Sequence, residues 1–217
     1  MIKVLIADDH AIVRQGLKQV LAEADDMQVG GEATNGLETL EQIRNHDWSV
    51  VVMDMSMPGR SGIELIKLAK AERPKLPILI LTMHSEDQYA MRALQAGASG
   101  YMTKESAPEQ LVNAIRKVAA GGVYVSAATA EKLAQNIRPG NEALPHTRLS
   151  NREFEVFQML TTGISLSEAA QKLSLSVKTI STHKTHILAK LNLANQTELV
   201  RYAIKHGLAD EAGSQTH

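Results

Sequence analysis

The sequence predicts an α/β N-terminal domain of the (βα)5 type, with a doubly wound parallel sheet, followed by an all-α C-terminal domain. Over residues 1–123, short apolar runs alternate five times with segments of helical periodicity, which is typical of a parallel sheet. The runs Val50–Met53 and Ile78–Leu81 are apolar throughout, as expected where helices cover both faces of the sheet. From Leu149 onward only helical patterns remain, so the fold class changes there.

The elements of the N-terminal domain follow one another in strand–helix order. The predicted strands are Lys3–Asp8, Val29–Ala33, Ser49–Asp54, Pro77–Thr82 and Gly100–Thr103, and the predicted helices are His10–Ala24, Gly36–Asn45, Gly62–Glu72, Glu86–Ala96 and Pro108–Ala120. Asn35 and Ser61 are suitable N-caps, while Gly97 and Gly121 are suitable C-terminal stops. Right-handed crossovers between parallel strands then give a flavodoxin-like sheet with strand order 2-1-3-4-5.

The C-terminal half is predicted to be a linker, a small helical domain and a tail. Residues 124–147 are interpreted as a linker with one helix, Ser126–Ile137, because the residues after that helix are rich in proline and polar side chains. Residues 148–211 begin with Ser150 and Glu153 at capping-box spacing. The predicted helices Ser167–Leu173, Val177–Leu191 and Leu199–His206 include a helix-turn-helix arrangement. Residues 212–217 are expected to form a disordered tail.

Composition limits the classes of function. The 217 residues are 44% hydrophobic and 22% charged and include no cysteine, which excludes disulfides and thiolate metal sites. No signal-peptide pattern and no apolar run of the roughly 18 residues of a membrane span occurs, so we expect a cytoplasmic protein without a membrane partner. Residues 1–123 hold 13 Lys/Arg against 16 Asp/Glu, whereas residues 148–217 hold 8 against 6. This modest basic excess favours nucleic acid as a partner of the second domain.

Four predicted strands deliver polar side chains to the same end of the sheet. Asp8 and Asp9 follow the first strand, Asp54 ends the third, Thr82 ends the fourth and Lys104 follows the fifth. In this strand order a ligand binds between strands 1 and 3, so the acids should meet in one crevice. Carboxylates suit Mg²⁺. A carboxylate beside the metal can accept a phosphoryl group, with Lys104 and Thr82 contacting its oxygens.

Each of these residues alone has a structural explanation. Asp9 at a strand–helix junction can cap the first helix, and Asp54 lies where a loop after a strand often carries an aspartate. Thr82 and Lys104 alone are unremarkable. Only their joint placement at one sheet edge favours a phosphate and metal site.

The N-terminal residues resemble the receiver domain of bacterial response regulators. The resemblance rests on Asp8-Asp9, on Asp54 followed by Met57-Pro58-Gly59 and Gly62, on Thr82, and on Tyr101 three residues before Lys104. It implies that Asp54 accepts phosphate from a sensor histidine kinase. It also implies that Asp8, Asp9, Asp54 and the backbone carbonyl of Ser56 bind Mg²⁺, and that Thr82 and Tyr101 form a switch pair. Met83, where many receivers carry a smaller residue, is expected to slow loss of the phosphate.

The C-terminal half resembles the LuxR-type helix-turn-helix. The matching segments are Leu149–Glu153, Leu175–His183, Lys190-Leu191 and Glu198–Val200. Together the two halves resemble a NarL/FixJ-type response regulator. The resemblance implies binding to double-stranded DNA as a homodimer, with RNA polymerase as a further partner.

Helical geometry selects the residues that would meet DNA. In Val177–Leu191 the apolar stripe is Ile180, Ile187 and Leu191, and the opposite face is expected to enter the major groove. The candidate contacts are Lys178, Thr179, Ser181, Thr182, Lys184, Thr185 and Lys190. The lysines are expected to contact phosphates, which position a protein without reading sequence. His183 lies beside the apolar stripe and is interpreted as a packing or phosphate-contacting residue.

The sequence is therefore interpreted as a transcription regulator controlled by phosphorylation, and not as an enzyme. One alternative is a phosphatase with an aspartyl nucleophile. The pattern of such enzymes has a second aspartate two residues after the first. This chain has Ser56 at that position. A second alternative is a regulator that acts without phosphate. A third is an RNA-binding protein, although aromatic residues make up only 3% of the chain.

Overall fold

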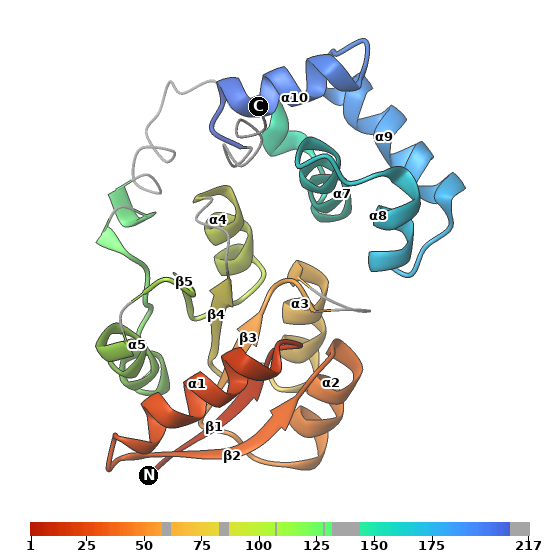
Figure 1. Ribbon diagram of the computed structural model, residues 1–217. Coiled ribbons are helices and arrows are strands. Elements are labelled where there is room, and N and C mark those ends of the chain that lie inside the picture. Colours follow the sequence, from red (N-terminus) through yellow and green to blue (C-terminus); the bar gives the residue numbers. More distant parts are fainter. Residues whose placement is uncertain (58–61, 83–86, 107, 128, 132–143, 209–217) are drawn as a thin grey trace. The chain divides into compact units, whose positions relative to one another are not determined.

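The computed structural model describes residues 1–57, 62–82, 87–106, 108–127, 129–131 and 144–208. The chain forms two compact units, Met1–Pro139 and Gly140–His217 (Figure 1). The boundaries after residues 123 and 147 stay predictions. Of the expected linker helix, residues 127 and 129–131 are helical, and its remainder lies outside the described residues, as does the tail.

The first unit is a five-stranded parallel sheet, as predicted. Its strands are β1 (Ile2–Ala7), β2 (Met27–Ala33), β3 (Val50–Asp54), β4 (Ile78–Thr82) and β5 (Gly100–Thr103). They lie in the order β2-β1-β3-β4-β5, and each neighbouring pair is parallel. This confirms the predicted fold class and strand order. Because β1 and β3 are neighbours, the loops that follow them lie at the switch point of the sheet.

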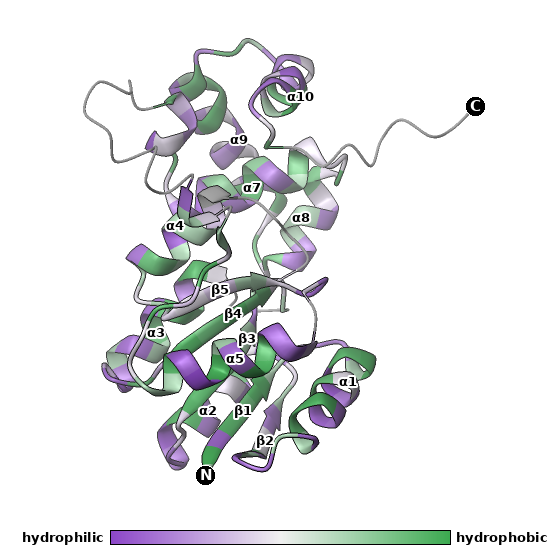
Figure 2. Cartoon of the chain, turned by 90° about the vertical axis from the view of Figure 1, so that its left-hand side faces the viewer, coloured by the Kyte–Doolittle hydropathy of each residue, from purple (hydrophilic) through white to green (hydrophobic). Residues whose placement is uncertain are grey.

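Helices cover both faces of this sheet (Figure 1). They are α1 (Ala11–Ala22), α2 (Gly36–Asn45), α3 (Gly62–Glu72), α4 (Asp87–Gln95) and α5 (Pro108–Ala119). On the face under α1 and α5, alternate strand residues such as Val4 and Ile6 pack against Leu17, Leu21 and Ile115. The central strands β3 and β4 therefore carry buried side chains on both faces and are almost continuously hydrophobic, whereas the edge strand β2 alternates (Figure 2).

The helix ends follow most of the capping signals. The Asn35 side chain accepts a hydrogen bond from the backbone N–H of Glu38, and Gly97 and Gly121 have φ of +107° and +85° after their helices. Ser61 lies outside the described residues. The explanation of Asp9 as a helix cap is wrong, because His10 occupies the N-cap of α1 and makes no side-chain cap.

The second unit is wholly helical. It consists of the 3₁₀ turn η1 (Pro145–Arg148) and of α7 (Asn151–Thr161), α8 (Leu166–Lys172), α9 (Val177–Leu191) and α10 (Gln196–Lys205). The capping box of Ser150 and Glu153 is present, as the spacing predicts. The last helix begins three residues earlier than expected, because Asn195 caps it by accepting a hydrogen bond from the Glu198 N–H. Among the described residues, no helix is long and apolar enough to cross a membrane.

Candidate functional site

The carboxyl ends of β1, β3 and β5 bring two acids and one lysine into contact. Asp8 and Asp54 are only 2% and 3% exposed. The Lys104 Nζ lies 2.6 Å from Asp8 Oδ2 and 2.9 Å from Asp54 Oδ2. The backbone N–H of Lys104 donates to the Thr82 carbonyl over 2.7 Å, which fixes the loop after β5 to the end of β4. A phosphoryl group on Asp54 would therefore lie within contact distance of this ammonium group.

The neighbouring donors fit a hard cation. Ligand atoms of Asp8, Asp9, His10 and Asp54 lie within 4.8 Å of one another. The three carboxylates offer the oxygen ligands that Mg²⁺ prefers, whereas the His10 imidazole suits it less well. Asp54 Oδ1 accepts a hydrogen bond from the Ser56 N–H over 3.2 Å. These residues could therefore hold a magnesium ion.

Two residues of this site were missed by the sequence reasoning. His10 Nδ1 lies 2.9 Å from Asp9 Oδ1 and 3.3 Å from Asp8 Oδ1. Arg14 donates from Nη1 to the Asp8 backbone carbonyl over 2.7 Å. His10 directly follows the two acids, so its position was a usable signal. Arg14 gave none, because one helical turn had to form before its side chain could reach back to Asp8.

Burial and charge oppose each other at Asp54. Burial raises the pKa of the Asp54 carboxyl above its ordinary value, the Lys104 ammonium lowers it, and the nearby Asp8 carboxylate raises it again. Burial also lowers the pKa of Lys104. Even so, its hydrogen bonds to Asp8 and Asp54 leave the Lys104 pKa raised. The lysine therefore stays charged, and ionising Asp54 in the folded protein is less favourable than in water.

Replacing Asp54 with asparagine is expected to raise the thermal unfolding temperature at neutral pH without divalent cations. Because the folded-state pKa of Asp54 lies above 3.8, its contribution to stability is complete below that pH and is lost as the pH rises. The gain over wild type should therefore shrink in acid. Thermal melts of both proteins between pH 4 and 8 would show whether the difference in unfolding temperature shrinks as the pH falls towards the ordinary carboxyl pKa. The exposed control Asp25→Asn should melt like wild type, and an Asp54→Asn melt below wild type at neutral pH would contradict the prediction.

The two residues predicted as a switch pair are buried. Thr82, at the end of β4, is fully buried, and Tyr101 in β5 is 3% exposed. The Tyr101 N–H donates to the Tyr124 carbonyl over 2.9 Å. Met83 lies outside the described residues.

Helix α9 presents the expected face. Ile180, Ile187 and Leu191 are buried against the rest of the helical unit. The residues on the opposite side are exposed: Lys178, Ser181, Thr182 and Thr185. Val177, at the start of the helix, keeps 46% of its surface exposed beside Lys178 and was absent from the predicted set. Its position in the first turn of the helix predicted to enter the major groove could have added it to that set.

Three other predicted contacts are engaged within the unit. Lys184 Nζ donates to Gln196 Oε1 over 2.8 Å, and Lys190 Nζ donates to Glu153 Oε2 over 2.6 Å. Thr179 lies in the capping turn of Ser176, with 2.8 Å between their hydroxyl oxygens. His183 is half-buried, and burial and the Arg152 charge lower its pKa, which agrees with a packing role.

Comparisons with known proteins match both units. A family model described as the response regulator receiver domain matches residues 4–116. A second model, described as bacterial regulatory proteins of the luxR family, matches residues 147–203.

Similar proteins span nearly the whole chain. The oxygen regulatory protein NreC of Staphylococcus carnosus is 40% identical over 96% of this chain and 99% of its own. The response regulator UvrY of Escherichia coli K12 is 36% identical over 97% of each chain. A solved structure of RcsB from Salmonella enterica serovar Typhimurium, bound to the promoter rprA in the presence of phosphomimetic BeF₃⁻, is 31% identical. It covers 93% of this chain and 97% of its own, with a TM-score of 0.68.

Proposed function

Because this chain belongs to the NarL/FixJ-type response regulators, which join a receiver domain to a LuxR-type DNA-binding domain, we propose that phosphorylation of Asp54 controls its binding to DNA. The observation that carries the proposal is the buried contact of Lys104 with both Asp8 and Asp54 at the switch point of the sheet. A structural ion pair needs no second buried acid, whereas a phosphate site uses both acids and the lysine.

In the proposed reaction an oxygen of Asp54 attacks the phosphorus of a phosphohistidine on the kinase. The new O–P bond forms as the P–N bond breaks, and the histidine leaves. Mg²⁺ held by Asp8, Asp9, Asp54 and the Ser56 carbonyl would supply positive charge to the phosphoryl oxygens. Lys104 favours the ionised form of Asp54 against the effect of burial before transfer, and it then contacts a phosphoryl oxygen. Ser56 stands where a phosphatase of this kind would carry a second acid, and this favours a regulatory phosphorylation of Asp54 over a hydrolytic enzyme.

The phosphoryl group on Asp54 would act through its charge and through changes in side-chain packing. Phosphorylation adds about two negative charges next to Lys104. We propose that Thr82 donates its hydroxyl to the phosphoryl group and that Tyr101 repacks as β4 and β5 respond. Moving a population from mostly inactive to mostly active needs about 5 kcal/mol of differential interaction. Formation of a homodimer on paired DNA half-sites would add to it. RNA polymerase as a further partner and a cytoplasmic location belong to the same proposal.

A genome-wide pull-down of bound DNA tests the control by phosphate. Wild type should occupy specific promoters, and Asp54→Ala should occupy them several-fold less, because the inactive state is then favoured. The matched control is Asp25→Ala, which removes an exposed acid. Equal peaks and occupancies for wild type and Asp54→Ala would reject phosphorylation control and leave DNA binding standing.

On the DNA side, we propose that the exposed face of α9 enters the major groove. Lys178 is the lysine of the predicted set for which the described residues show no side-chain partner, so it is free to contact a phosphate. Lys178→Ala is expected to lower the slope of log affinity against log salt by about one. Lys205→Ala, which removes an exposed lysine from α10, should leave the slope unchanged. Fluorescence anisotropy over a salt series measures both, and equal slopes for Lys178→Ala and wild type would exclude the contact.

A further inference from the structure

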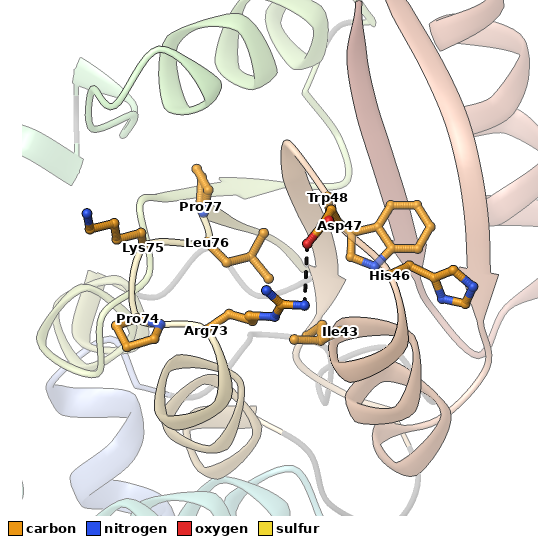
Figure 3. A pocket seen from close by; sticks show the side chains of 9 residues that line it. All are labelled: Ile43, His46, Asp47, Trp48, Arg73, Pro74, Lys75, Leu76 and Pro77. Carbon is orange, nitrogen blue, oxygen red and sulfur yellow. Dashed lines mark ion pairs between the residues drawn. The ribbon is translucent and has the colours of Figure 1, made fainter.

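A cavity of about 430 Å³ opens at the amino ends of β3 and β4, away from the acids (Figure 3). It lies between the loop that follows α2 and the loop that follows α3. The residues that line it are Ile43, His46, Asp47, Trp48, Arg73, Pro74, Lys75, Leu76 and Pro77. Its volume falls within the range of small-molecule sites in proteins. Nothing in the proposed phosphate chemistry uses it.

One wall of the cavity is Trp48, which is held in place from several sides. Its indole N–H donates to the Gln42 carbonyl over 2.8 Å, and Lys3 Nζ lies 4.7 Å from its ring centroid. The indole packs so closely on β2 that a Cβ on Gly31 would come within 2.6 Å of it. An aromatic side chain fixed in this way is a preformed apolar surface for a ligand.

The opposite wall is the loop after α3, and it is also fixed. Lys70 Nζ donates to the Leu76 carbonyl over 2.7 Å and to the Pro74 carbonyl over 3.3 Å. Leu76, with 8% of its surface exposed, supplies an apolar floor, and the fully buried Ile43 supports it from below. The cavity therefore has two fixed walls and does not depend on a ligand to form.

Arg73 brings a positive charge to this apolar space. Its guanidinium points toward Asp47 across the cavity, and Nη2 lies 3.3 Å from Asp47 Oδ1 (Figure 3). The Asp47 side chain is 95% exposed, and such surface pairs contribute little. Asp47 is the one acid among the nine lining residues. Its carboxylate is therefore a weakly held partner that another carboxylate can replace.

We propose that this cavity binds a small carboxylate with a flat apolar body. The body would lie against the accessible parts of Trp48 and Leu76, and the carboxylate would take the place of Asp47 on Arg73. A guanidinium can bind a carboxylate through two parallel hydrogen bonds, which gives the charge a defined orientation. Receptor and ligand would thus be matched in both charge and apolar area.

The chain's one tryptophan lines the cavity, so its indole N–H is a specific reporter. Benzoate added to the ¹⁵N-labelled full-length protein should shift the indole signal saturably, with a dissociation constant at or below about 1 mM. Benzamide, which has the same shape without the charge, should bind at least about ten-fold more weakly. Absence of any shift up to about 10 mM benzoate would overturn the proposal.

Two substitutions should move the affinity in opposite directions. Arg73→Gln should weaken benzoate binding by at least about ten-fold. Asp47→Asn should tighten it by about two- to five-fold, because the competing carboxylate is removed. Arg44→Gln is the matched control, since the Arg44 side chain pairs with Glu72 and does not line the cavity. It should bind benzoate like wild type.

A purely structural role for Arg73 would not make Asp47→Asn bind more tightly, so the pair of variants separates binding from folding. Equal shifts with benzoate and benzamide would mean a non-specific apolar hollow, and unchanged affinity in Arg73→Gln would exclude the proposed anchor. An indole signal that moves with protein concentration alone would mean that a carboxylate of a second copy fills the cavity. Each of these three results overturns the proposal.

Discussion

Asp54→Ala is expected to abolish labelling of the protein by a small phosphodonor such as acetyl phosphate. Asp54 ends β3 as a buried carboxylate within hydrogen-bond distance of Lys104, and Asp8, directly after β1, is an acid that could hold a metal ion beside it. Asp8 also contacts Lys104, but in the proposed reaction only Asp54 attacks the phosphorus, so the substitution removes the attacking oxygen. The initial labelling rate should fall at least about a hundred-fold, equivalent to roughly 2.7 kcal/mol in the barrier.

The experiment is intact-mass measurement with Mg²⁺ present, which counts phosphoryl groups per chain directly. Asp25→Ala, an exposed acid on the same domain, serves as the control and should label like wild type. Asp54→Asn should fail like Asp54→Ala, although it keeps the shape of the side chain. Full labelling of either Asp54 variant would reject Asp54 as the phosphoacceptor.

Phe157→Ala is expected to abolish DNA binding while labelling at Asp54 continues. Phe157 and Phe154 are fully buried in α7, with ring centroids 5.9 Å apart, and they are the only two phenylalanines of the chain. Deleting a buried phenylalanine side chain costs about 3–5 kcal/mol. That loss is comparable to the whole stability of a domain as small as the helical unit. The receiver domain has its own core and should stay folded.

Two measurements on one sample separate the outcomes of this substitution. Anisotropy with labelled DNA reports the helical unit, and intact-mass labelling reports the receiver domain. Phe157→Leu, which keeps most of the apolar volume, should retain most of the DNA binding. Loss of both activities in Phe157→Ala would mean that the two units do not fold independently, and retained DNA binding would mean that α7 does not support α9.

Sequence reasoning recovered the elements where local signals agreed. Gly36–Asn45, Gly62–Glu72 and Val177–Leu191 have the predicted bounds. Asn35 and Ser176 cap the first and the last of these helices, and buried apolar residues run along all three. Strand ends moved by one or two residues, as for Met27 at the start of β2, because strand length depends on the neighbour that pairs with it. Asn195 was overlooked as a cap, which placed the start of α10 too late.

At the candidate site, the residue types and their positions along the strands predicted which side chains would lie together. Parallel strands bring their carboxyl ends to one edge, so Asp8, Asp54, Thr82 and Lys104 followed from the pattern. By itself the sequence thus determined the fold class and the family, and it predicted the class of chemistry.

Only the tertiary structure decided which side chains contact one another. Lys104 is shared by two buried acids, 50 residues separate it from Asp54, and Lys190 is drawn to Glu153 across the helical unit. Such contacts depend on side-chain reach and burial after packing, which no local periodicity encodes. The cavity beside Trp48 arises in the same way, because two loops far apart in the sequence close around it.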